Sequence, residues 1–180
     1  MKKIFLFYVL AVLLFSCNSA PEKTEASATV SDTTTEKEPD LPFKAIYSSK
    51  FTDDVSDADL AMVMQTYKDW ADGNAAGLES VLADSVDYDA SSGYSKKVTK
   101  AALTNLWKTF RDSLSSVKID MYAWKKMYAT DKKEGHVVTW YKEIDTYKDV
   151  RIDSATYHDI NGVKDGKLVW YSSMKRPFLK

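Results

Sequence analysis

Apolar residues recur every three to four positions over residues 57–72, which is the period of an amphipathic α-helix. Ser56 immediately precedes this segment, and Asp59 lies three residues after Ser56. This is the spacing of a capping box with Asp in place of Glu. Asp72-Gly73-Asn74 then ends the pattern, so we predict a helix over residues 57–72. The apolar positions on its face are Leu60, Val63, Met64, Tyr67, Trp70 and Ala71.

Two shorter helices follow before the pattern changes. Leu78, Val81 and Leu82 indicate a helix over residues 75–83. A third helix is expected to begin after Thr99, whose side chain caps it, and to continue to about residue 114. Its apolar stripe consists of Leu103, Leu106, Trp107, Phe110 and Leu114. A short strand is expected between these two helices, at residues 85–89.

The second half of the chain has the residue pattern of β-strands. From Ser115 onward, β-branched and aromatic residues form four runs separated by turn signals, at 116–130, 136–147, 150–161 and 167–176. Three helices followed by long consecutive strands predict an α+β domain whose helices pack on one face of a mainly antiparallel sheet. Strands of this length should curve, with bulges at irregular points such as Ala123-Trp124.

The N-terminus has the form of an export signal. Met1-Lys2-Lys3 is basic, and the apolar run over residues 4–15 is shorter than the ~20 residues of a membrane-spanning helix. Leu14-Phe15-Ser16-Cys17 resembles the lipobox of bacterial lipoproteins, although Phe15 is bulkier than the usual residue there. The resemblance implies that residues 1–16 are a removed signal peptide and that Cys17 is lipidated. The alternative is an ordinary secretory signal with an incidental cysteine.

A lipidated Cys17 would place the protein in the cell envelope, exported and lipid-anchored to a bacterial membrane. Residues 17–44 are then the lipidated cysteine and a flexible tether, because the stretch 18–40 is rich in Ser, Thr, Glu and Pro, with Val30 its only large aliphatic residue. The folded domain is expected over residues 45–180. Cys17 is the only cysteine, so no internal disulfide forms and stability must come from the core.

Charge and composition limit the partners. The 180 residues include 25 Lys and Arg against 26 Asp and Glu, a formal net charge of −1 with no basic cluster, which argues against nucleic-acid binding. Two histidines and one cysteine are too few for a closed zinc site, and no ligand spacing supports another metal. We therefore expect no metal and no cofactor.

Two stretches resemble motifs of the nuclear transport factor 2-like superfamily. Residues 72–86, DGNAAGLESVLADSV, are similar to its second-helix signature, and Asp165-Gly166-Lys167-Leu168-Val169 is similar to the turn of its last hairpin. The order of expected elements over residues 56–176 also agrees. The resemblance implies three N-terminal helices packed in the concave face of a curved mixed, mainly antiparallel sheet, a cone-shaped barrel with a pocket. The superfamily includes ketosteroid isomerase, SnoaL-like polyketide cyclases and dehydratases, so fold alone does not specify function.

Similarity to ketosteroid isomerase suggests the candidate acid–base residues. Asp159 aligns with the pocket Asp of that enzyme, where burial would raise its pKa; alternatively, it lies at a strand end and binds backbone or solvent. Asp89 is the nearest carboxylate to the aligned base position, Ala90, and a slip of one residue turns a strand side chain to the other face. The aligned helix position is Thr66, beside Tyr67. Only one of three catalytic positions matches cleanly.

Aromatic side chains indicate the kind of ligand. Five tryptophans and eleven tyrosines supply large apolar area with polar edges, which suits a flat or apolar ligand. Histidine side chains commonly serve as general bases at neutral pH, which makes His158 a candidate, but it neighbours Asp159 on a strand, so the two should face opposite sides. The candidate pocket residues are Tyr67, Tyr88, Trp124, Trp140, Tyr157 and His158. For the strand tryptophans, the alternative is an exposed sheet face through which two copies form a homodimer.

Three functions remain open on this sequence. The first is a lipoprotein that binds a small hydrophobic ligand, the second is an isomerase, cyclase or dehydratase with a pocket Asp, and the third is a protein-interaction module of the envelope. We favour the first, because no complete set of catalytic residues can be identified in the sequence.

Overall fold

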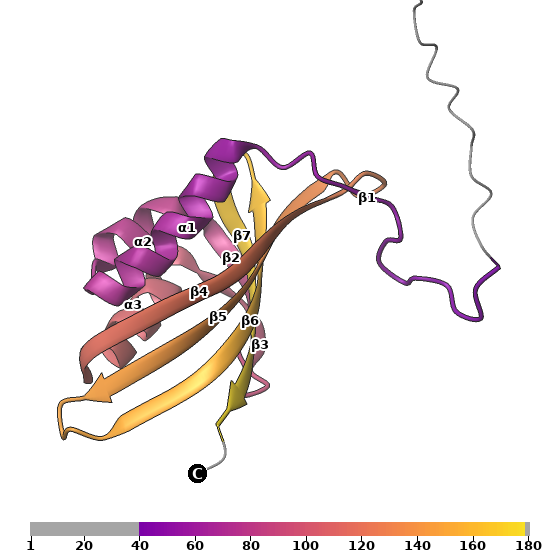
Figure 1. Cartoon of the computed structure of the whole chain (residues 1–180). Coiled ribbons are helices and arrows are strands. Elements are labelled where there is room, and N and C mark those ends of the chain that lie inside the picture. The colour runs from indigo at the N-terminus through magenta and orange to yellow at the C-terminus, as the bar shows by residue number, and fades with distance from the viewer. Residues whose placement is uncertain (1–39, 179–180) are drawn as a thin grey trace, which may run out of the picture. The chain divides into compact units, whose positions relative to one another are not determined.

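The computed structural model describes residues 40–178, so Cys17, the signal and most of the tether lie outside the described residues. The described chain forms three helices and a seven-stranded mixed sheet (Figure 1). The helices are α1 (Asp57–Asp72), α2 (Ala75–Val81) and α3 (Lys100–Arg111). The strands are β1 (Phe51–Thr52), β2 (Leu82–Asp89), β3 (Ser95–Thr99), β4 (Leu114–Ala129), β5 (Glu134–Tyr147), β6 (Ile152–Lys164) and β7 (Lys167–Pro177).

The sheet is open. Its strand order is β1-β4-β5-β6-β7-β2-β3, and all neighbouring pairs are antiparallel except β2 with β7. Because β1 and β3 form its two ends and do not pair with each other, the expectation of a closed, cone-shaped barrel is wrong. The α+β class and the mixed, mainly antiparallel sheet are confirmed.

Local signals position the first helix as predicted. The Ser56 Oγ accepts a hydrogen bond from the Asp59 N–H at 3.0 Å, which satisfies one of the free donors of the first turn of α1. Gly73 ends α1 at φ 75°, a left-handed conformation that glycine adopts without a Cβ penalty. None of the helices within residues 40–178 is long and apolar enough to cross a membrane.

The other boundaries differ from the prediction by a few residues. Helices α2 and α3 end earlier than expected, because Leu82 and Leu114 already belong to strands. Thr99 caps α3 as predicted, with its Oγ1 accepting from the Ala102 N–H at 3.3 Å. Strands β1 and β3 were not expected, since their side chains are mostly exposed and carry no apolar alternation. The pairing of β4 with β5 shifts register twice, between Leu114 and Ser116 and between Met121 and Ala123, and the second shift lies next to the expected irregular point.

The three helices lie together on one side of the sheet (Figure 1). Val63 and Tyr67 of α1 pack against Val137 and Tyr141 of β5 in one buried cluster. A second buried cluster contains Leu82, Val86, Leu103 and Leu168. Full burial of an aliphatic side chain contributes about 1.5–3 kcal/mol, so these two clusters hold the helices on the sheet.

Candidate functional site

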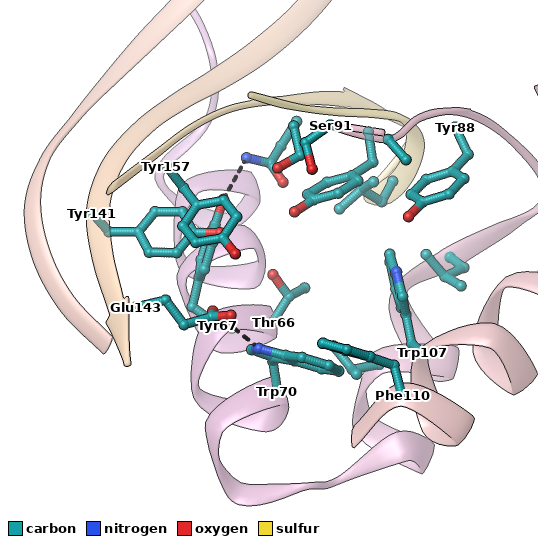
Figure 2. Close-up of a pocket in the computed structure, with 17 residues that line it drawn as sticks. Thr66, Tyr67, Trp70, Tyr88, Ser91, Trp107, Phe110, Tyr141, Glu143 and Tyr157 are labelled. Atoms are coloured by element: carbon teal, nitrogen blue, oxygen red, sulfur yellow. Dashed lines mark hydrogen bonds between the residues drawn. The ribbon is translucent and has the colours of Figure 1, made fainter. Parts of the chain in front are cut away.

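A cavity of about 180 Å³ lies between the helices and the inner side of β5, β6 and β7 (Figure 2). Among the described residues that line it, Glu143 is the only one with a charged side chain. Eight of the lining residues are aromatic: Tyr67, Trp70, Tyr88, Trp107, Phe110, Tyr141, Tyr157 and Tyr171. The cavity is therefore an aromatic enclosure with one carboxyl group.

One wall comes from the ends of two helices. The Arg111 guanidinium donates hydrogen bonds to the carbonyl oxygens of Trp70 and Ala71, each at 2.9 Å, and so ties α3 to the last turn of α1. This contact brings the Trp70 and Phe110 rings together, with their planes within 5° of parallel and their centroids 5.9 Å apart. The two rings lie side by side along one boundary of the open space (Figure 2).

Strand β5 supplies the carboxyl group. Side chains alternate along a strand, so Thr139, Tyr141 and Glu143 share the face that the helices cover. The Glu143 Oε2 accepts a hydrogen bond from the Trp70 Nε1–H at 3.1 Å (Figure 2). Burial and, next in size, the nearby charge of Asp145 raise the pKa of Glu143 to about 8. Glu143 is thus mainly protonated at neutral pH.

Asp159 lies behind the cavity wall. Its side chain is 0% exposed, and its Oδ2 accepts hydrogen bonds from the hydroxyls of Tyr67 at 3.1 Å, Tyr141 at 2.8 Å and Tyr171 at 2.8 Å. Burial raises the pKa of Asp159, while these hydrogen bonds act in the opposite direction. Asp159 does not line the cavity. Its interactions position three tyrosines that do, and the alternative of a solvated strand end is wrong.

Asn161 presents an acceptor without a partner. Its Nδ2 donates to the Tyr67 hydroxyl at 3.0 Å and to the Val137 carbonyl at 3.1 Å. Because a backbone carbonyl only accepts, this contact fixes which end of the amide is nitrogen. The other end, Oδ1, is buried and has no hydrogen-bond partner within residues 40–178, and Asn161 lines the cavity.

The cavity has a neighbouring surface groove. Tyr88, Trp107 and Phe110 line both the cavity and a wider groove of about 780 Å³, whose other lining residues belong to α3, β3 and the segment between β2 and β3. Phe110 is 45% exposed, so its ring stands between the interior and the surface. The cavity and the groove therefore share a wall on this side.

Three of the candidate pocket residues, Tyr67, Tyr88 and Tyr157, line the cavity. Asp89 does not. Its carboxylate accepts from the Trp170 Nε1–H at 2.7 Å and from the Ser95 hydroxyl, and these hydrogen bonds lower its pKa. Since Tyr88 faces the cavity, strand alternation directs Asp89 to the other face. Asp89 and Asp159 are therefore not brought together.

Trp124, Trp140 and His158 also lie outside the cavity. Trp140 follows Thr139 and precedes Tyr141, so it faces the opposite side of β5, where its ring stacks on His158 at 4.9 Å between centroids. Its side chain is 37% exposed, and that of Trp124 is 53% exposed. The structure does not place these three residues near Glu143.

Sequence reasoning missed Glu143, Trp70, Trp107 and Phe110 as site residues. The three aromatic residues were assigned to apolar helix faces, and nothing local distinguishes a core ring from one that borders a cavity. One sequence feature could have indicated Glu143: it lies on the same alternating face of β5 as Val137 and Tyr141. The opposite face of β5 is also partly apolar, so the sequence does not show which face is buried. Within residues 40–178, no three His, Cys, Asp or Glu side chains cluster as metal ligands.

No family model and no curated protein matches this chain. Many solved structures do match it in fold. An LEH-like epoxide hydrolase from M. tuberculosis has a TM-score of 0.55 and 9% identity, over 66% of this chain and 83% of the other. A nuclear transport factor 2-like protein of unknown function from Burkholderia pseudomallei has a TM-score of 0.54 and 10% identity, over 67% and 92%.

A third similar structure is a protein with a ketosteroid isomerase-like fold from Catenulispora acidiphila, in complex with trimethylamine. Its TM-score is 0.52 at 11% identity, over 62% of this chain and 82% of the other. At these identities the likeness concerns the fold alone. The chain thus has the nuclear transport factor 2-like fold, the class to which ketosteroid isomerase-like and SnoaL-like proteins belong, and this fold serves enzymes as well as proteins without known activity.

Proposed function

We propose that the protein is a cell-envelope lipoprotein whose nuclear transport factor 2-like domain binds a small, flat ligand in the cavity beside Glu143. The observation that carries this proposal is the aromatic lining of an interior space that adjoins a surface groove. Aromatic walls with a few polar groups are typical of sites for small ligands. Rings that served only as core would instead be expected to fill the space, because protein interiors are close-packed.

The size of the cavity limits the ligand. A dry cavity of about 150 Å³ is known to hold benzene, and this one measures about 180 Å³. The interior therefore suits one ring with small substituents, and a larger ligand would have to extend past Phe110 into the groove. A fused four-ring steroid does not fit inside.

Binding can be tested with two substitutions on the same helix. Phe110→Ala removes one cavity wall, whereas Leu106→Ala changes the groove only, and both side chains are nearly half exposed, so both variants should fold. With 4-methylphenol as a single-ring probe, calorimetry should show affinity weakened about tenfold for Phe110→Ala, a loss of about 1.4 kcal/mol. Equal affinity of both variants and the wild type would contradict the proposed site.

Acid–base catalysis is the second candidate function. The observation that favours it is that the carboxyl of Glu143 lines the cavity with a pKa of about 8, near the operating range of a general acid or base. Such a group would suit an isomerase or a lyase. Turnover of a ring ketone by the wild type that is lost in Glu143→Gln would support this alternative, and equal turnover by both would reject it.

The lipid anchor rests on the sequence around Cys17. Cys17→Ala should abolish labelling of cells with a palmitate analogue and release the protein from the membrane fraction. Ser19→Ala, two residues along, is the matched control and should keep both properties. Full membrane retention of Cys17→Ala would contradict a lipid anchor.

The outer face of the sheet is a candidate surface for the association of two copies of the domain. Trp140, His158 and Met174 are register partners across β5, β6 and β7, and they form an apolar row on the face opposite the helices. We propose that two copies of the domain pair through this row. Sedimentation equilibrium should show a dimer that Trp140→Asp weakens and Leu106→Asp leaves unchanged; a monomer at all concentrations would exclude it.

A further inference from the structure

We propose that the ligand carries a positive charge, an organic ammonium group bound against the Glu143 carboxylate and the aromatic rings beside it. This inference rests on the proposed function of the cavity and adds the chemical class of the ligand. Three independent features of the site support it: its charge, its rings and its unpartnered acceptor.

The charged side chain that lines the cavity is a carboxyl, so the lining favours a positively charged ligand. Glu143 is the only charged lining residue, and no Lys or Arg side chain within the described residues lines the cavity. The two cations that act on the neighbouring Asp145 have other partners, because Lys175 pairs with Asp153 at 2.7 Å and Arg111 binds carbonyl oxygens at the end of α1. An anionic ligand would find no counter-charge in this cavity, whereas a cationic ligand finds one when Glu143 gives up its proton.

The rings provide faces for a cation. Trp70 and Phe110 lie on one side of the space, and Tyr141 and Tyr157 lie on another, with ring planes within 9° of parallel and centroids 5.2 Å apart (Figure 2). A cation near the face of a Trp, Tyr or Phe ring is attracted by the electron-rich face, and quaternary ammonium groups are bound in such aromatic surroundings. The Trp70 Nε1–H also donates a hydrogen bond to Glu143, so the indole ring and the carboxyl border the same part of the cavity.

The unpartnered acceptor adds to this preference. Asn161 lines the cavity, and its Oδ1 is buried with no hydrogen-bond partner among the described residues. A buried acceptor without a donor is unfavourable, and a ligand that carries positive charge or N–H groups compensates it. A ligand rich in carbonyl or carboxylate oxygens would leave Asn161 unsatisfied.

Binding of a cation must displace a proton. The free protein holds a proton on Glu143 because the pKa of this group is about 8, so the cation binds as the proton leaves to solvent. For a ligand with permanent charge, affinity should rise about tenfold between pH 7 and pH 9 and then level off. The titratable groups that act on Glu143 are Asp145 and Tyr141 on the same strand and Asp159 and Tyr157 on β6. Those that act on Asp145 also include Asp153 on β6, Lys175 on β7 and Arg111 on α3.

The probe pair is phenyltrimethylammonium and its neutral carbon analogue tert-butylbenzene, which share one shape and do not titrate. Binding to the wild-type protein is followed by tryptophan fluorescence between pH 6 and pH 9. We expect the cation to bind more tightly than its neutral analogue at pH 9, with the tenfold rise for the cation only. Equal affinity at every pH would overturn the inference.

Glu143→Gln separates charge from shape. Gln keeps the size of the side chain and an oxygen that accepts from Trp70, so this variant should lose the pH dependence and bind the cation at least tenfold more weakly at pH 9. Glu79→Gln on α2, an exposed acid, is the matched control and should behave as the wild type. If Glu143→Gln fails to fold, the wild-type pH profile decides alone.

The outcomes distinguish this inference from the proposed function. Binding of the neutral analogue with no advantage for the cation would reject the ammonium ligand and keep a ring-binding cavity. If neither probe binds and 4-methylphenol also fails to bind, both the cavity function and this inference are rejected.

Discussion

Two buried carboxyl groups face the same side of the sheet and have different surroundings. Asp159 on β6 is enclosed by three tyrosine hydroxyls that belong to α1, β5 and β7. Glu143 on β5 has one hydrogen-bond donor, Trp70, and borders the cavity. All three donors bind the Oδ2 of Asp159, whereas its Oδ1 has no hydrogen-bond partner among the described residues. The comparison shows that several donors make an inward carboxyl part of the structural framework, and we propose that Glu143, with one donor, meets a ligand instead.

The two groups also differ in how they affect neighbouring residues. Asp159 is an acceptor that keeps Tyr67, Tyr141 and Tyr171 in place, so removing it affects three buried donors together. Burial and the charge of Asp145 raise the pKa of Glu143, so its protonation state changes near neutral pH. We therefore expect the first region to control stability and, under the proposed function, the second to control binding.

Loss of Asp159 should have the largest effect. Asp159→Ala leaves three buried tyrosine hydroxyls without this acceptor and opens a small cavity, so we expect the free energy of unfolding to fall by about 3–5 kcal/mol. Urea denaturation should show a lower midpoint with an unchanged slope. Asp87→Ala on β2, where the acid is exposed, should change stability by less than about 0.5 kcal/mol. Equal stability of the two variants would mean that Asp159 is not held by the tyrosines.

The pH dependence of stability should report Glu143. Its pKa is about 8 in the folded state and about 4.5 in the unfolded chain, so between these values only the folded state holds the proton. Stability should therefore fall as pH rises from 4.5 to 8, by up to about 1.4 kcal/mol per unit, and level off above pH 8. Asp145 and Asp159 have raised pKa values and contribute in the same direction.

Glu143→Gln should flatten most of this slope, measured as the urea midpoint across the pH range. Glu79→Gln, which replaces an exposed acid, should retain the wild-type slope. A wild-type midpoint that does not change between pH 5 and pH 8 would show that Glu143 is solvated in the folded state.

A smaller effect should follow from removing one of the three donors. Tyr141→Phe leaves Asp159 with the hydroxyls of Tyr67 and Tyr171 and is expected to lower the free energy of unfolding by about 1 kcal/mol. Both variants are measured by urea denaturation, in which Tyr122→Phe on β4, whose ring is largely exposed, should have no measurable effect. A loss as large as that of Asp159→Ala would mean that the three tyrosines do not share the carboxylate.

The helices could be predicted closely from the sequence, because their signals are local. The apolar period from Leu60 to Ala71, the Ser56 cap and Gly73 each act within a few residues, and α1 has the predicted bounds. The inner face of β5 could not be predicted in the same way. Thr139, Tyr141 and Glu143 alternate with Trp140, Lys142 and Ile144, so the two faces have similar polarity.

The candidate site was harder to predict for a related reason. The resemblance to ketosteroid isomerase pointed to Asp159. Its three tyrosine partners lie at positions 67, 141 and 171, and only the folded chain brings them together. Ala90, the aligned base position, lines the cavity and has no acid–base group. The carboxyl in the cavity is on a different strand, where no motif marks it.

The most direct test is a carbon NMR titration of the side-chain carboxyl groups, with and without phenyltrimethylammonium. We predict that Glu143 titrates near pH 8 in the free protein and at a lower pH when the cation is bound, while the Asp159 signal stays unchanged. If the ligand instead moves the Asp159 signal and leaves Glu143 titrating near 4.5, then Asp159 is the group that meets the ligand, and the assignment of roles made for the two carboxyls is wrong.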